Sequence, residues 1–163
     1  MSGILNRAFL PSDKDFILSS WARSFMRSQD TGPIPIELYF ETYRQVIEHV
    51  LTRPRVRIHV AVDPDMEAPF EIHGYIVAEP GPFRKGVRDV EKPAVHFLYV
   101  KETRRRKGLA TSLMRAAQVD PRQPFFFTFR TPDARALVRA CYWQGEYHPN
   151  IVKYTNHKET REN

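Results

Sequence analysis

Apolar residues recur along the chain with two different periods, and each period predicts one type of secondary structure. Before residue 51 they return at helical spacing, which predicts a helix ending near Arg27 and a second one at 38–50, closed by Pro54. Further on, short apolar runs between turn residues predict strands. The predicted strands span residues 6–10, 57–62, 71–78, 95–100, 125–129 and 150–155, and two further helices span 111–118 and 133–143.

The order of these elements, with strands and helices alternating along most of the chain, predicts an α/β (α+β) fold. The run at 125–129 is apolar at nearly every position, as expected for a covered central strand. Residues 79–93 are rich in glycine and proline and are expected to form a long loop, either shaping a substrate mouth or lying on the surface. We expect one domain over 1–156 and a charged tail at 157–163.

Composition narrows the class of protein. The chain of 163 residues, with 11 Phe and 7 Tyr, can bury one sizeable core, and a single cysteine, Cys141, excludes an internal disulfide. No apolar run is long enough to span a membrane, and the charges at 13–15 interrupt the stretch that a signal peptide would need, so we expect a cytoplasmic protein. The net charge of +6 suits an anionic partner, either a nucleic acid or a polyanionic cofactor.

The densest basic segment, residues 104–107, follows the predicted strand at 95–100 and precedes a predicted helix. The start of a helix offers unpaired backbone N–H groups and the positive end of its dipole, which together attract phosphate. Gly108 allows the backbone to approach a ligand closely, and Ala110 is nearly as small. The sequence therefore predicts a site for a phosphorylated cofactor.

Neither common phosphate loop, Gly-x-x-x-x-Gly-Lys-Ser/Thr or Gly-x-Gly-x-x-Gly, occurs here. The segment from Leu98 to Met114 instead resembles the GNAT acetyltransferase superfamily, whose Arg/Gln-x-x-Gly-x-Gly/Ala motif is matched at 105–110. The predicted element order also matches that family, and the resemblance implies a mixed central sheet with helices on both faces, splayed after the cofactor strand. It further implies acetyl-coenzyme A in the gap and transfer of its acetyl group to an amine. It implies these cofactor-binding residues: Leu98, Tyr99, Val100, Arg105, Arg106, Lys107, Gly108, Leu109, Ala110 and Thr111.

Acyl transfer also needs an acid for the leaving thiolate and a base for the amine. The family often uses a tyrosine about four residues before a glycine; counting back from Gly145 reaches Cys141, so Tyr142 is the first candidate and Tyr147 the second. His96, on the cofactor strand, is the first candidate base because histidine titrates near neutrality, although a single histidine in an apolar strand is more often a hydrogen-bonded core residue. Glu71, His73 and an ordered water are the alternatives.

The amine acceptor could be a small molecule, a protein or a nucleic acid, and the protein could be a monomer or a homodimer. Two functions other than ordinary acetyl transfer also remain open. Residues 16–21 are similar to GNAT-like proteins of bacteriophages, some of which modify DNA bases. The candidate DNA contacts are Arg53, Arg55, Arg57, Arg84, Lys85 and Arg88, with Trp21, Tyr39, Tyr43 and Trp143 for stacking. The chain could also bind coenzyme A without catalysis. No metal site is expected, although His59, His73 and His96 could converge as ligands.

Overall fold

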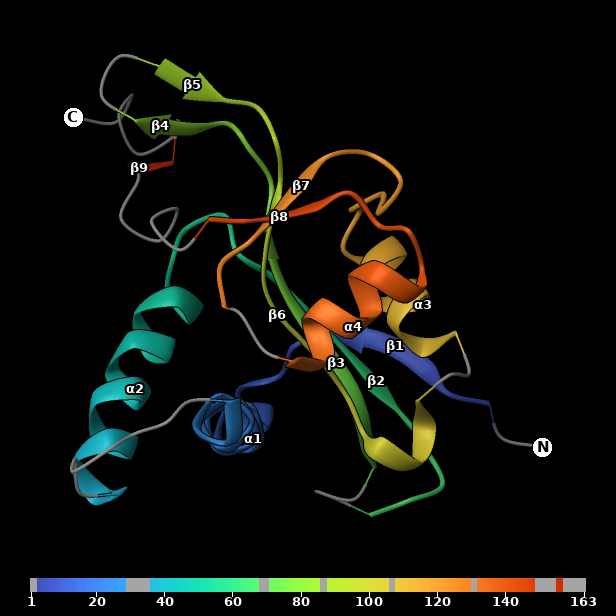
Figure 1. The fold of residues 1–163 in the computed structure, drawn as a ribbon. Helices are drawn as coiled ribbons and strands as arrows, with labels where there is room; N and C mark the ends of the chain where they lie inside the picture. Colours follow the sequence, from blue (N-terminus) through green and yellow to red (C-terminus); the bar gives the residue numbers. More distant parts are fainter. Residues whose placement is uncertain are drawn as a thin grey trace.

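The structure is a computed structural model of the chain, and it describes residues 3–28, 36–67, 71–85, 88–105, 108–129, 132–148 and 155–156. A six-stranded sheet of order β1-β2-β3-β6-β7-β8 forms the centre (Figure 1). Its strands are β1 (Leu5–Ala8), β2 (Arg57–Val62), β3 (Ile72–Glu79), β6 (Ala94–Val100), β7 (Phe125–Phe127) and β8 (Gly145–Tyr147). A smaller sheet of order β5-β4-β9 contains β4 (Phe83–Lys85), β5 (Arg88–Val90) and β9 (Thr155–Asn156).

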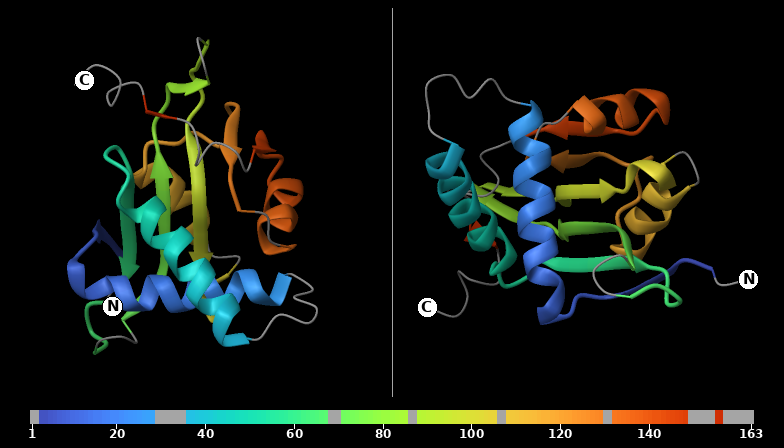
Figure 2. Two further views of the ribbon diagram at one scale, coloured as in Figure 1. Left: turned by 90° about the vertical axis from the view of Figure 1, so that its left-hand side faces the viewer. Right: turned by 90° about the horizontal axis from the view of Figure 1, so that it is seen from below.

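Helices cover both faces of the large sheet, as the sequence predicts. On one face lie α1 (Lys14–Ser28), which runs across the strands, and α2 (Ile36–Leu51); on the other lie α3 (Leu109–Ala116) and α4 (Pro132–Ala140) (Figure 2). Two short 3₁₀ turns, η1 (Pro11–Asp13) and η2 (Glu102–Arg104), precede α1 and follow β6. The mixed α/β fold is thereby confirmed.

Each face of the sheet has its own hydrophobic core. Under α1 and α2, Trp21 stacks on Phe97 with ring centroids 4.8 Å apart, and both pack among aliphatic residues of β2 and β3. On the other face, Leu113 and Met114 of α3 are fully buried beside Ile76. Burial of these apolar side chains on both sides fixes the sheet between its helices.

The pairing of the strands changes direction in the middle of the sheet. From β1 to β6 all neighbours are antiparallel, whereas β6 with β7, and β7 with β8, are parallel. The parallel pairs need crossover connections, which α3 and α4 supply. The change of direction therefore lies beside the segment that the sequence predicts to bind the cofactor.

Two local expectations differ from the structure. The predicted loop at 79–93 contains the β4–β5 hairpin, whose Phe83 is fully buried against Ala94 and Phe126. The helix predicted at 133–143 ends at Ala140, and Gly145 begins β8, where an added Cβ would lie 2.9 Å from the Phe125 ring. The strand predicted at 150–155 falls mostly outside the described residues, as does the tail at 157–163.

Candidate active site

A cleft opens where β6 and β7 separate. The two strands pair only at Ala94 with Phe126 and at Val95 with Phe127, and the Thr128 N–H donates a last hydrogen bond of 3.2 Å to the Val95 carbonyl. Beyond this point β6 continues to Val100 beside β3 alone. The described part of β7 gives no partner to that edge of β6, so its backbone groups face the cleft.

The direction of these groups follows from the β3–β6 ladder. The Lys101 N–H donates to the His73 carbonyl on β3 at 2.8 Å, and residues two apart on a strand point their N–H groups the same way. The Tyr99 N–H therefore faces β3, while those of Leu98 and Val100 face the cleft. Consistently, the Val100 carbonyl accepts a hydrogen bond from Arg105 Nε at 3.2 Å.

The β6 strand bends at a β-bulge just before this free edge. Val77 of β3 is opposite Phe97, but the next residue, Ala78, is opposite Val95, so His96 is the extra residue. A bulge bends its strand and increases the local twist. The bulge at His96 therefore lies at the point where β6 turns away from β7.

The start of α3 lies at the open end of the cleft. Gly108 caps the helix with φ +77° and ψ 6°, and the Ser112 N–H makes the first helical bond, 3.0 Å to the Gly108 carbonyl. The N–H groups of Leu109, Ala110 and Thr111 thus have no helical acceptor. A Cβ added to Gly108 would meet no atom within 4 Å, which leaves open space in front of these donors.

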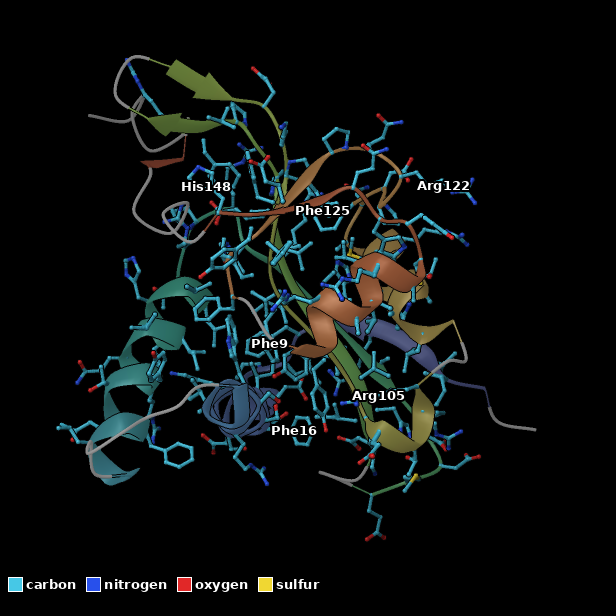
Figure 3. The ribbon with its side chains drawn as sticks, viewed as in Figure 1. Phe9, Phe16, Arg105, Arg122, Phe125 and His148 are labelled. Atoms are coloured by element: carbon cyan, nitrogen blue, oxygen red, sulfur yellow. The ribbon has the colours of Figure 1, made fainter. Side chains whose placement is uncertain are left out.

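A cavity of about 570 Å³ joins these features. Its walls come from the β6 edge, from the start of α3 and from a mostly apolar side formed by Phe125, Phe127, Leu137 and Trp143. Arg104 and Arg105 line it near α3 (Arg105 and Phe125 are labelled in Figure 3). A cavity with phosphate-binding donors at one end and an apolar channel beyond fits a ligand such as coenzyme A, which has a pyrophosphate and a flexible pantetheine arm.

The predicted cofactor-binding residues are largely brought together here. Those that line the cavity are Leu98, Tyr99, Val100, Arg105, Gly108, Leu109, Ala110 and Thr111. Arg106 and Lys107 lie outside the described residues. The motif residues thus surround one space, and their contacts with a ligand remain a prediction.

The two tyrosines predicted as acids lie elsewhere. Tyr142 is 89 % exposed and has φ +54°, because it occupies the left-handed position of the turn that ends α4, where Trp143 N–H bonds the Val138 carbonyl at 3.1 Å. Tyr147, on β8, packs against Phe127 with ring centroids 5.6 Å apart and is 43 % exposed. Neither lines the cavity; Cys141 and Tyr99 do.

His96, the predicted base, lies at the cavity wall, but its side chain is buried in a hydrogen-bonded chain. Its Nε2 lies 2.9 Å from Glu79 Oε1 and its Nδ1 lies 2.9 Å from Thr128 Oγ1, while its side chain has no exposed surface. Burial lowers the pKa of His96, against the raising effect of Glu79. With both ring nitrogens engaged and no solvent contact, the imidazole has no nitrogen free for an amine in this conformation.

Glu79 also accepts two hydrogen bonds from Arg53, at 2.7 Å and 3.1 Å. Burial alone would raise the pKa of Glu79, but the hydrogen bonds from His96 and Arg53 outweigh it and lower the pKa to about 2. Glu79 is therefore ionised at neutral pH. Sequence reasoning missed this carboxylate and Thr128, because only the fold brings residues 53, 79, 96 and 128 together.

His73, a further candidate base, is the extra residue of a second bulge, in β3. Its side chain is 2 % exposed, and within the described part of the chain neither ring nitrogen has a hydrogen-bond partner. Burial lowers the pKa of His73, and the positive charges of Arg104 and Lys101 lower it further. His73 does not line the cavity, so its imidazole is not placed to contact a ligand there.

His73 leads to a prediction about acid stability. Because its folded pKa lies below the unfolded value of about 6.5, the unfolded chain binds more protons as the pH falls below that value, and stability declines. His73→Leu removes two unsatisfied nitrogens, so we expect it to raise the free energy of unfolding by about 1 kcal/mol and to flatten this decline. Urea unfolding of both proteins at about pH 7.5 and about pH 5.5 measures it. If the wild type and His73→Leu lose the same free energy of unfolding between the two pH values, His73 does not cause the decline.

Other candidate groups from the sequence are not brought together in the described residues. No group of three His, Cys, Asp or Glu side chains in them could hold a metal ion, and His59, on β2, does not join His73 and His96. Glu71 precedes β3 and is absent from the cavity lining. No helix in the described ranges is long and apolar enough to cross a membrane.

Comparison with known proteins agrees with this geometry. Residues 20–136 match the model of the acetyltransferase (GNAT) family. No curated protein matches the chain. Solved structures that are similar to it include the following three. A protein from Pyrococcus furiosus described as an acetyl transferase is 14% identical, with 99% of this chain and 93% of that chain covered and a TM-score of 0.54.

The second is described as histone acetyltransferase HPA2 and related acetyltransferase, from Corynebacterium glutamicum; it is 14% identical, with 86% and 84% covered and a TM-score of 0.55. The third, described as a GNAT acetyltransferase from Desulfovibrio desulfuricans, is 18% identical with a TM-score of 0.42; 70% of this chain is covered but only 63% of that protein's length. At these identities the likeness to the first two shows the fold alone. The family model covers most of the chain, and the chain belongs to the acetyltransferase (GNAT) family.

Proposed function

We propose that the protein is an acetyl-coenzyme A-dependent N-acyltransferase that acetylates an amine. Acetyl-coenzyme A is the acyl donor of the family to which the chain belongs. The observation that carries the proposal is the single cavity that joins the uncapped N-terminus of α3 to the free edge of β6. One end supplies donors for a pyrophosphate, and the other supplies donors for a thioester carbonyl.

The chain's own groups divide the work as follows. The N–H groups of Leu109, Ala110 and Thr111, with Arg104 and Arg105, bind the pyrophosphate. The free β6 edge pairs with the pantetheine arm and polarises the carbonyl through the N–H groups of Leu98 and Val100. Bound acetyl-coenzyme A supplies a thioester, whose C–S bond breaks as the amine nitrogen forms a bond to the carbonyl carbon.

The proton that the leaving sulfur needs comes, in this proposal, from the Tyr99 hydroxyl. Tyr99 is the tyrosine among the described residues that line the cavity, and its ring is fixed by stacking on Tyr75 at 5.3 Å and by an edge contact with Phe16 at 5.9 Å. Tyr142 and Tyr147 remain candidate acids from the sequence, but each needs a rearrangement to reach the cavity. A water molecule takes the proton of the amine, since the His96 ring is fully engaged.

The structure gives the DNA-modifying alternative no specific support. Arg53 is buried in its ion pair with Glu79, and Arg57 donates to Gln118 at 2.6 Å. Trp21 is fully buried in the core. The side chains of Tyr39, Lys85 and Arg88 lie outside the described residues. We therefore propose an ordinary amine acceptor, and include amino-bearing nucleosides in the acceptor panel as the test of the alternative.

Acetyl-coenzyme A should stabilise the protein and shield Cys141, which is exposed and lines the cavity. At a hundred times its dissociation constant the ligand adds about 2.7 kcal/mol to the free energy of unfolding, which raises the melting temperature by about 5 to 10 °C. It should also slow alkylation of Cys141 by iodoacetamide, followed by mass spectrometry. Adenosine 3′,5′-bisphosphate, which lacks the pantetheine arm, is the matched control and should leave Cys141 reactive.

Turnover decides between an enzyme and a binding module. The protein is incubated with acetyl-coenzyme A and a panel of small amines, peptides with a free amino terminus, and amino-bearing nucleosides. Mass spectrometry should show release of coenzyme A and addition of one acetyl group to at least one amine. No melting shift and no protection of Cys141 would contradict cofactor binding. Binding without acetylation of any acceptor would favour a non-catalytic module.

A further inference from the structure

A chain of four buried polar side chains crosses the sheet at the point where β6 and β7 part. Arg53 follows α2, Glu79 ends β3, His96 is the bulge residue of β6, and Thr128 follows β7. The Arg53 and Glu79 side chains are 7% and 0% exposed, and Thr128 is 4% exposed. We call these four residues the fork clamp; the elements that carry them are seen in Figure 1.

The hydrogen bonds of the fork clamp have one consistent arrangement. An ionised Glu79 can only accept, so His96 Nε2 must donate to it, over 2.9 Å. The neutral ring then leaves Nδ1 as an acceptor for the Thr128 hydroxyl, also at 2.9 Å. Arg53 holds the same carboxylate from the other side. Every ring nitrogen and carboxylate oxygen is thus engaged, which fixes the orientation of the imidazole.

The order carboxylate–histidine–hydroxyl is also that of a nucleophile triad, but the location argues against that role. Thr128 is buried and does not line the cavity, whereas its neighbours Phe127 and Phe129 do. A hydroxyl that cannot meet the thioester cannot attack it. The fork clamp therefore acts through the backbone that it holds.

That backbone is the part of β6 and β7 where the two strands separate. On one strand the clamp holds the bulge residue His96, directly before the free edge at 97–100. On the other it holds Thr128, whose own N–H makes the last β6–β7 hydrogen bond. A buried ion-paired chain is weak evidence of a contribution to stability, because well-packed apolar residues often serve as well; retention of one specific geometry is the other use of such groups.

We propose that the fork clamp is a positioning device that sets the angle between β6 and β7, and thereby holds the N–H groups of Leu98 and Val100 where a thioester carbonyl binds. This inference deepens the proposed function and rests on it for the identity of the ligand. Misplacement of reacting groups by about 1 Å costs on the order of 100-fold in rate, so clamp variants should lose far more activity than stability.

The test compares four single variants with the wild type. Thr128→Val removes the hydroxyl at constant shape, Thr128→Ser restores it, and Glu79→Gln removes the charge. Asp13→Asn is the matched control: Asp13 is a carboxylate 2% exposed, held by Arg7 through bonds of 2.7 Å and 2.9 Å, and its element η1 lies outside the cavity lining. It removes the charge of a buried carboxylate that pairs with a partly exposed arginine, at a site away from β6 and β7.

Two readouts are taken at a temperature where all five proteins are folded by circular dichroism. The first is the amide NMR spectrum of the ligand-free protein. The second is the affinity for acetyl-coenzyme A with kcat and KM for whichever panel amine the wild type acetylates. Thr128→Val and Glu79→Gln should shift the amide signals of residues 97–100 and lower kcat about 30- to 100-fold, with a smaller change in the KM for the amine.

Thr128→Ser should recover the amide spectrum and at least about a third of the wild-type rate, and Asp13→Asn should match the wild type in both readouts despite a lower melting temperature. Unshifted amide signals at 97–100 in Thr128→Val would overturn the proposal whether or not a ligand is known. Equal rate losses in Asp13→Asn and Thr128→Val would overturn it too. A wild type that binds no acetyl-coenzyme A contradicts the proposed function instead, and the NMR comparison then decides the clamp by itself.

Discussion

Gly108→Val is expected to lower the affinity for coenzyme A by at least about 100-fold while the protein still folds. Gly108 has φ +77°, and the space beside it, where its Cβ would lie, is open toward the free N–H groups of α3. A valine side chain would fill that space and keep a pyrophosphate from these donors. Loss of two charge-assisted hydrogen bonds at about 1.5 kcal/mol each corresponds to about 100-fold in affinity.

Valine also strains the backbone at a positive φ, at a cost of about 1 to 2 kcal/mol. Gly108→Asn separates the two effects, because asparagine tolerates this conformation while its side chain still fills the space. Isothermal titration with coenzyme A should therefore show a similar loss for both variants, with a higher melting temperature for Gly108→Asn. Wild-type affinity in a folded Gly108→Val protein would show that the phosphate site lies elsewhere.

Tyr99→Phe is expected to lower kcat by about 100-fold or more, with the affinity for acetyl-coenzyme A changed by less than about threefold. Loss of a general acid costs about 10² to 10⁴ in rate, whereas the phenyl ring keeps the contacts with Tyr75 and Phe16. Steady-state kinetics with the best amine of the panel, together with titration of acetyl-coenzyme A, separates the two quantities.

Tyr142→Phe and Tyr147→Phe are the comparison variants. If the acid is the tyrosine that the sequence suggests first, the loss appears in Tyr142→Phe and Tyr99→Phe remains active. Such a result would mean that the turn after Ala140 rearranges when ligands bind, because Tyr142 is 89 % exposed in this structure. Full activity of all three variants would mean that solvent, and not one of these tyrosines, protonates the leaving thiolate.

The sequence predicts the large elements and the cofactor segment because both depend on local signals. The strand at 57–62 matches β2 residue for residue, and the motif glycine at 108 begins α3 with the conformation that only glycine adopts freely. Register and direction of side chains are not local. The bulge that makes His96 the extra residue of β6 follows from its pairing with β3, so a core position of His96 could be foreseen as an alternative but its partners Glu79 and Thr128 could not.

The end of α4 shows the same limit on a smaller scale. Spacing from Gly145 places Cys141 and Tyr142 next to each other near the site, but a helix can end with either one turned toward the sheet. The left-handed turn at Tyr142 decides the outcome, since it directs Cys141 to the cavity and Tyr142 to solvent. A tyrosine at that position gives no sequence signal for such a turn, because glycine usually occupies it.

A crystal structure of the protein with coenzyme A tests the central claim most directly. The claim predicts the pyrophosphate against the N–H groups of Leu109, Ala110 and Thr111, and the pantetheine arm along the β6 edge at Leu98 and Val100. Coenzyme A bound at any other surface, with the space between β6 and β7 filled by side chains, would contradict it.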